Sequence, residues 1–191
     1  MTHAQDAWPA TRSPLVRFAE AVEGAGALDA VARTVRPLAD ALVADPTRRD
    51  ALRGKWLGHA LHPLMTDLPI GFWTSANVLD LVGGPSARPA ARMLTGLGVA
   101  TAVPTAITGW AEFAALGTDR DRRTASAHAI GNAVAIWCYT GSWVARRRGN
   151  TSAGVALGLA GATVASVAGL LGGHLAAARR VATRHPAFEN G

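Results

Sequence analysis

Residues 149–178 read GNTSAGVALGLAGATVASVAGLLGGHLAAA, a long run without a charged side chain. A helix needs about 20 mostly apolar residues to cross the hydrocarbon core of a bilayer. Uncharged runs also cover residues 93–111 and 124–145, and residues 56–79 hold a single carboxylate, Asp67. Because these runs are apolar all round rather than along one stripe, they predict membrane spans instead of the buried helices of a soluble protein.

The composition of the whole chain agrees with this prediction. Of the 191 residues, 49% are hydrophobic and only 17% are charged, whereas about a quarter are charged in an average soluble domain. A disordered chain would be polar and highly charged, so that class is excluded. One cysteine also excludes a disulfide scaffold and a cluster held by several cysteine thiolates.

The sequence therefore predicts an all-α fold, a four-helix transmembrane bundle with an N-terminal amphipathic helical segment. Turn-forming glycines separate the apolar runs, which places the four spans at about residues 63–82, 91–116, 125–145 and 152–177. We expect three regions: a cytoplasmic helical tail at residues 1–55, the bundle at residues 56–178 and a cytoplasmic C-terminal tail at residues 179–191.

An amphipathic helix is expected before the first span. Leu28, Val31, Val35, Leu38 and Leu42 recur at helical spacing, with charged residues between them. Such a helix could lie on the membrane surface or cap the end of the bundle, and the sequence does not choose between these two arrangements.

Arginine and lysine near the span ends predict the orientation. Four spans place both termini on one side, and that side carries more arginine and lysine than the other. The positive-inside rule then predicts a multi-pass protein of the cytoplasmic (inner) membrane with both termini in the cytoplasm. The net charge of +6 is explained by this topology and by contact with anionic lipid, so the bilayer is the expected partner and nucleic acid is not.

Polar side chains from all four spans are expected at the cytoplasmic end of the bundle. Up-and-down order brings the starts of spans one and three together with the ends of spans two and four. Polar groups at membrane depth are costly and mark candidate sites. The candidate metal ligands at this end are His59, His62, Asp67, Glu112, His128 and His174, with Asn132 and Trp110 as supporting residues.

Local sequence refines two of these positions. His62 precedes Pro63 and is therefore biased toward extended backbone, as at a helix N-cap. The partial positive charge of a helix N-terminus favours neutral imidazole, which is the form that binds a metal or haem iron. Asn132 follows His128 at the i, i+4 spacing, which places both on one side of a helix.

Two interpretations of the polar residues remain open. In the functional one, His62, His128 and His174 bind a cofactor, either haem b between two imidazoles, with His62 or His128 paired with His174, or a metal ion held by histidine and carboxylate. In the other, the histidines are solvated at the interface or fix helix packing, and Asp67 and Glu112 pair with Arg53 or Arg123.

Several motifs resemble those of a known family, the bacterial membrane domain called domain of unknown function 2231. Its opening motif is similar to residues 58–64, GHALHPL, followed by DLPIG at residues 67–71. Residues 104–110, PTAITGW, resemble the end of its second helix. Arg123, His128, Asn132 and GGHL at residues 172–175 match its later motifs, so the resemblance covers about residues 57–175.

This resemblance implies a four-span membrane protein without an established activity. Many relatives are followed by a Rieske iron–sulfur domain, which implies electron transfer. The present chain ends shortly after its fourth span, and one cysteine cannot supply a Rieske site. The redox partner is therefore expected in another chain.

We expect a redox-associated haem b or metal-binding module that works with a partner chain in trans. The alternative is a non-catalytic membrane anchor or assembly protein. A proton pathway through His62, Asp67 and His128 ranks below both, since four spans form a pore only as a homo-oligomer and inverted repeats are not evident. The usual nucleophile, phosphate-loop and zinc-protease motifs are missing, so enzymatic activity stays undecided.

Overall fold

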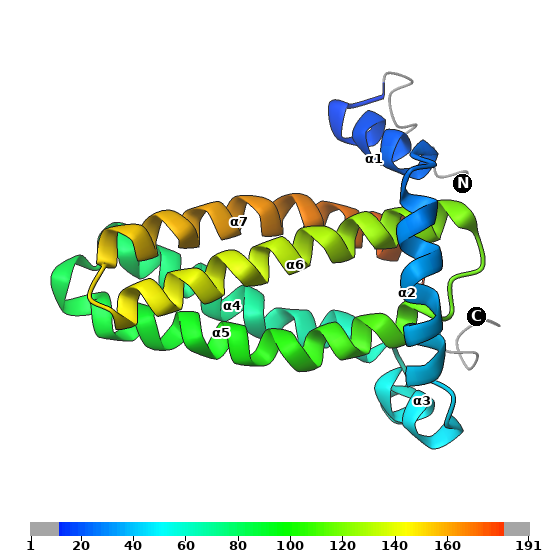
Figure 1. Cartoon of the computed structure of the whole chain (residues 1–191), viewed down its shortest axis with the longest axis horizontal. Coiled ribbons are helices and arrows are strands. Elements are labelled where there is room, and N and C mark those ends of the chain that lie inside the picture. The colour runs from blue at the N-terminus through cyan, green and yellow to red at the C-terminus, as the bar shows by residue number, and fades with distance from the viewer. Residues whose placement is uncertain (1–11, 182–191) are drawn as a thin grey trace, which may run out of the picture.

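The structure is a computed structural model that describes residues 12–181, and this part of the chain folds into helices (Figure 1). Three short helices come first: α1 (Pro14–Gly24), α2 (Leu28–Leu42) and α3 (Pro46–Leu52), followed by a 3₁₀ turn at Lys55–Leu57. Four long helices follow and lie side by side: α4 (Leu61–Val82), α5 (Gly84–Phe113), α6 (Asp119–Arg147) and α7 (Thr151–Gly173). The all-α class is confirmed.

Local chemistry explains where the long helices begin. The Thr118 side chain accepts a hydrogen bond from the Asp121 backbone N–H, and the Asn150 side chain accepts one from the Ala153 N–H, so each caps the helix that follows. Helices α4 and α5 are joined with almost no loop. Gly84 turns the chain there with a φ of 65°, a left-handed conformation that glycine adopts without a Cβ penalty.

The helices extend beyond the predicted apolar runs at several ends. Helix α5 begins at Gly84 rather than near residue 91, and α6 begins at Asp119 rather than near residue 125. The expectation that His62 is an extended N-cap residue was wrong, because the extended residue is Ala60 (ψ 133°) and His62 lies in the first turn of α4. Pro63 fits there because first-turn N–H groups have no partner inside a helix.

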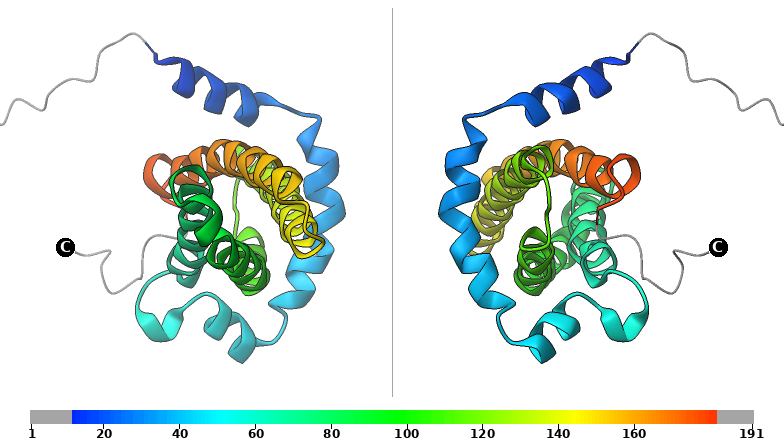
Figure 2. Two further views of the ribbon diagram at one scale, coloured as in Figure 1. Left: turned by 90° about the vertical axis from the view of Figure 1, so that its left-hand side faces the viewer. Right: turned by 90° about the vertical axis from the view of Figure 1, so that its right-hand side faces the viewer.

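The bundle consists of two helical hairpins that face each other. Within each hairpin, α4 with α5 and α6 with α7, the helices pack along most of their length. Between the hairpins, α5 contacts α6 more than α4 contacts α7, so the bundle is more open on the α4–α7 side. The end-on views of Figure 2 show this ring of four, in which α4 and α6 lie on a diagonal. Side chains from α4 and α6 therefore meet at the centre.

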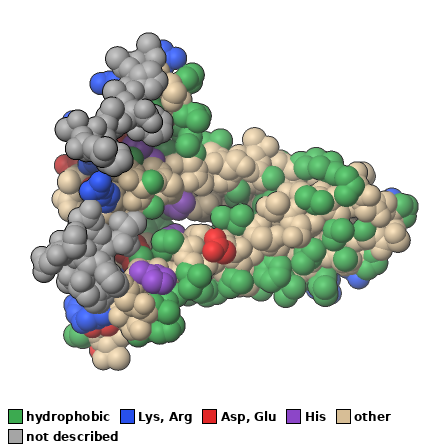
Figure 3. All heavy atoms as spheres, turned by 180° about the vertical axis from the view of Figure 1, so that it is seen from behind, with side chains coloured by type: hydrophobic (Ala, Val, Ile, Leu, Met, Phe, Trp, Pro, Cys, Tyr) green, Lys and Arg blue, Asp and Glu red, His purple; other side chains and the backbone are tan. Residues whose placement is uncertain are grey.

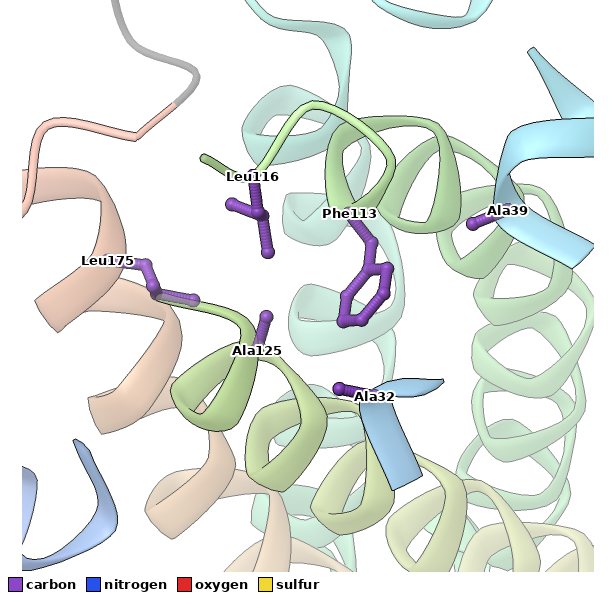
Figure 4. Packing of buried hydrophobic residues seen from close by; sticks show 6 residues of the cluster. All are labelled: Ala32, Ala39, Phe113, Leu116, Ala125 and Leu175. Atoms are coloured by element: carbon purple, nitrogen blue, oxygen red, sulfur yellow. The ribbon is translucent and has the colours of Figure 1, made fainter. Parts of the chain in front are cut away.

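Helix α2 runs across one end of the bundle, as Figure 1 shows. Its buried alanines, Ala32 and Ala39, pack into a cluster with residues of α5, of the α5–α6 connection, of α6 and of the π-helical turn that follows α7, drawn in Figure 4. That cluster consists of Ala32, Ala39, Phe113, Leu116, Ala125 and Leu175. Of the two arrangements open for the amphipathic helix, the structure has the one in which it caps the bundle.

Two helices in the described part of the chain are long and apolar enough to cross a membrane, namely Gly84–Phe113 and the stretch Thr151–Ala178, in which a π-helical turn extends α7. Helices α4 and α6 have the length but a lower mean hydropathy. Several of their polar residues, among them Asn77, Tyr139 and Ser142, are buried inside the bundle, whereas Asp67 of α4 is exposed. Part of the lower hydropathy of these two helices thus reflects what they place in the interior.

Candidate functional site

The imidazoles of His62 and His128 lie next to each other near the end of the bundle that α2 covers. Their ring centroids are 6.4 Å apart, and the ring planes are nearly perpendicular, at 89°. His62 is in the first turn of α4, and His128 is in the third turn of α6. Because α4 and α6 are diagonal helices, the two rings meet inside the bundle. The sequence predicts a haem pair of His62 or His128 with His174 instead, so the contact between His62 and His128 differs from that prediction.

A backbone carbonyl fixes the tautomer of each ring. His62 Nδ1 donates a hydrogen bond to the Thr105 carbonyl oxygen at 3.0 Å, and His128 Nδ1 donates one to the Ala168 carbonyl oxygen at 2.7 Å. A carbonyl oxygen can only accept, so both Nδ1 atoms carry hydrogen, and in the neutral form of each ring Nε2 carries the lone pair. Hydrogen bonds of this kind, from Nδ1–H to a carbonyl oxygen, orient histidine ligands of metals.

Each ring also packs against a glycine of the neighbouring helix. A Cβ atom at Gly109 of α5 would lie 2.8 Å from His62 Cε1, and one at Gly172 of α7 would lie 2.7 Å from His128 Cε1. Such distances are too short for carbon atoms in contact. Glycine at these two positions is therefore what allows the imidazoles to reach the carbonyl groups.

The two Nε2 atoms differ in their surroundings. His128 Nε2 accepts a hydrogen bond from the Asn132 amide at 2.9 Å, which confirms the i, i+4 pairing that the sequence predicted. Among residues 12–181, no hydrogen-bond donor to His62 Nε2 is found. His62 therefore has a free lone pair, whereas that of His128 is already used.

The remaining predicted ligands lie elsewhere. His174 Nε2 contacts a carboxylate oxygen of Glu23 at 2.8 Å, His59 is exposed with its Nδ1 near the Ala60 carbonyl oxygen, and Asp67 is exposed on α4. Glu112 is half-buried near the end of α5, and Trp110 packs against Phe113 in the end cluster. Within residues 12–181, no three histidine, cysteine, aspartate or glutamate residues come together as a metal site.

The carboxylates also do not make the arginine pairs that the sequence offered as an alternative. Arg53 donates to the Ala111 carbonyl oxygen, and Arg123 makes two hydrogen bonds to Asp29 of α2, at 2.6 and 2.8 Å. The hydrogen bonds from Arg123 hold the pKa of Asp29 below its usual range. The pair thus fixes α2 to the bundle through a carboxylate that is charged at neutral pH.

Two further pairs of residues between α4 and α6 were missed. Trp73 stacks on Tyr139 with ring centroids 4.1 Å apart and planes within 4° of parallel. Asp80 forms a double hydrogen bond with Arg146, and both side chains are almost completely buried. A signal was available in the sequence: Trp73 and Asp80 follow His62 at the same spacings at which Tyr139 and Arg146 follow His128.

These features define an all-α protein of the membrane type with two apolar helices that could span a bilayer and a paired-imidazole site inside its bundle. The chain belongs to the family described as predicted membrane protein (DUF2231), which matches residues 58–185 and thereby confirms the resemblance. The match begins just before His59 and includes every predicted site residue. Neither a curated protein nor a solved structure matches the chain.

Proposed function

We propose that the chain is a four-span protein of the bacterial inner membrane whose His62–His128 pair binds haem b in a redox module that works with a partner chain. The observation that carries the proposal is the pair itself: two neighbouring imidazoles in the bundle, each with Nδ1–H held by a backbone carbonyl. Both termini lie on the cytoplasmic side.

Exposed apolar side chains support four spans rather than two. Helix α4 exposes Leu64, Leu68, Ile70 and Val78, and α6 exposes Ile130, Val134 and Trp137. In water, such a surface on a small monomer would be unfavourable, whereas in lipid it is the expected outer surface. The 22 residues of α4 also give a length of about 33 Å, enough to cross the hydrocarbon core.

The donor set favours haem over a non-haem metal ion. A non-haem iron, zinc or manganese site normally takes three or more protein ligands, and the described residues place no third possible ligand beside the two imidazoles. Histidine is a common axial ligand of haem iron, so two facing imidazoles can supply its protein ligands. A metal site with Glu112 or Asp67 as a ligand therefore has less support than a haem site with two histidines.

The surroundings also favour a flat cofactor. Figure 3 shows a hollow on the α4–α7 side of the bundle, near the end that carries α1–α3, with histidine side chains at its edge. The Thr105 and Ala168 carbonyls would orient the imidazoles and increase their basicity as ligands. Binding through both rings requires the Asn132 amide to turn away from His128 Nε2. One-electron transfer is the chemistry that haem would supply there.

One observation favours the alternative of a non-catalytic anchor or assembly protein. Asn132 already occupies His128 Nε2, and both rings fit closely against glycine. If the pair only fixes helix packing, replacing either histidine would lower stability without removing any bound group. Neither role requires catalytic turnover, so we propose no enzymatic activity.

The test is the haem and metal content of the protein purified in detergent from cells supplied with iron and a haem precursor. The proposal predicts a Soret band and about one haem per chain, with the band lost in His62→Gln and in His128→Gln. His59→Gln is the matched control, because His59 is exposed outside the bundle. A folded wild-type protein without haem would support the anchor instead.

A further inference from the structure

Three pairs of residues meet along the centre of the bundle. His62 lies beside His128, Trp73 stacks on Tyr139, and Asp80 binds Arg146. The partners in every pair are separated by the same distance along the chain, 66 positions. From His62 to Asp80 a helix rises about 27 Å, so the three pairs are spread over most of the thickness of a membrane's hydrocarbon core.

The neighbouring helices repeat in the same way. His62 packs against Gly109 and donates to the carbonyl four residues before it, and His128 packs against Gly172 and donates to the carbonyl four residues before that glycine. Three turns further along, Trp73 packs against Gly98 and Tyr139 packs against Gly161. These contacts of the imidazoles and of the central aromatic rings in the α4–α5 hairpin thus have counterparts in the α6–α7 hairpin.

The amino-acid sequences of α4 and α6 agree in this register. Residues 62–78 read HPLMTDLPIGFWTSANV, and residues 128–144 read HAIGNAVAIWCYTGSWV. Beyond the histidines, the shared or similar pairs are Leu64 and Ile130, Leu68 and Val134, Ile70 and Ile136, Trp73 and Tyr139, Thr74 and Thr140, and Val78 and Val144. This similarity is parallel rather than inverted, which is why a search for inverted repeats does not find it.

We infer that the bundle is two copies of one helical hairpin related by a pseudo-two-fold axis along its centre, and that a difference between the copies makes His62 the imidazole open to a ligand. A side chain close to a two-fold axis meets its own equivalent, which explains why all three central contacts join equivalent positions. A single hairpin would leave its polar inner face in lipid, and a second copy covers it.

The difference between the copies lies one turn below each histidine. The Asn132 amide donates a hydrogen bond to His128 Nε2, and the equivalent residue in the first hairpin is Thr66. The Thr66 hydroxyl donates instead to the Pro63 carbonyl oxygen, at 2.6 Å within its own helix. His62 Nε2 therefore stays available to an electron-pair acceptor such as haem iron. The choice of haem iron as the ligand of His62 rests on the proposed function, whereas the repeat of the two hairpins does not.

The repeat predicts the effect of Thr66→Asn without any cofactor. In detergent-solubilised protein with ¹⁵N-labelled histidine, the Nε2 resonance of His62 should move toward that of His128, because the new amide would donate to it. Met65→Asn is the register control, and it should leave the resonance in place. An unchanged His62 resonance in Thr66→Asn, or an equal shift in both variants, would overturn the equivalence of positions 66 and 132.

A second test uses the far end of the axis. Asp80→Arg and Arg146→Asp alone should each abolish the monodisperse folded species, and the double exchange should restore it, since equivalent positions face each other. A double variant as unstable as the single ones would overturn the repeat. In a haemin titration, Thr66→Asn should bind at least tenfold more weakly than the wild type. If the wild type binds no haemin while the resonance shift is observed, the proposed function fails and the repeat stands.

Discussion

Arg146 of α6 holds both carboxylate oxygens of Asp80 of α4, at 2.8 and 2.5 Å, with 4% and 2% of the two side chains exposed. The Arg146 Nε also donates to Ser142 Oγ, so the guanidinium is held on two sides. Asp80 and Arg146 therefore connect α4 to α6, and so the two hairpins, at the end of the bundle opposite His62 and His128.

Removing one member of this pair should be more damaging than removing both. Asp80→Asn leaves the guanidinium buried without its counter-charge, and we expect a loss of about 3–5 kcal/mol of stability. The double variant Asp80→Leu/Arg146→Met removes both charges and should recover most of that loss. Thermal unfolding in detergent measures both variants, and a double variant as unstable as Asp80→Asn would contradict the role given to the pair.

Adding a methyl group at Gly172 should displace the His128 ring. The new Cβ would lie 2.7 Å from Cε1, and overpacking of this kind costs about 1–3 kcal/mol. Gly169→Ala in the same helix is the matched control, since its Cβ would meet nothing within 4 Å. Unfolding curves should separate Gly172→Ala from Gly169→Ala, and identical curves would show that the ring is not fixed where the structure places it.

The attachment of α2 should depend on pH through Asp29. Because the pKa of Asp29 in the folded protein lies below its unfolded value, the stabilisation is present above the unfolded pKa of about 3.9 and is lost as pH falls through the folded pKa. Proteolysis of the α1–α2 segment by an acid-active protease should therefore accelerate below about pH 4. Asp29→Asn should be cleaved quickly at every pH; cleavage that is independent of pH in the wild type would count against the attachment.

If α6 crosses the membrane, two exposed positions at its opposite ends should face opposite sides. In a Cys138→Ala background, the thiol introduced by Arg120→Cys should face the cytoplasm. The thiol introduced by Arg148→Cys should face the other side of the membrane. An impermeant maleimide added to intact cells should label only the second. Labelling of both, or of neither before lysis, would show that α6 does not cross the membrane.

The sequence predicts the helices well because the signal is compositional. The charge-free run at residues 93–111 lies inside α5, the run at residues 149–178 contains α7 and the π-helical turn after it, and glycines lie at the turns between the helices. Helix ends are less predictable: the first turns of α6 are rich in charge, and they remain helical because Thr118 caps them and Arg123 binds Asp29. Contacts of that kind are invisible in a hydropathy profile.

The site is only partly predictable for a related reason. His128 and Asn132 share a helix, so their spacing alone predicts the contact. The meeting of His62 with His128 depends on the rotation of two diagonal helices, and His174 instead reaches Glu23 of α1, which apolar patterns do not place near it. The signal that specifies the rotation is the spacing shared by His62, Trp73 and Asp80 with His128, Tyr139 and Arg146.

The most direct measurement is the absorption spectrum of wild-type protein purified in detergent with haem supplied during expression, compared with that of His62→Gln and His128→Gln. The wild type should show the spectrum of a low-spin haem held by two imidazoles, and either variant should lose it. A correctly folded wild-type protein that carries no haem, or a haem spectrum that survives both substitutions, would contradict haem binding by this pair.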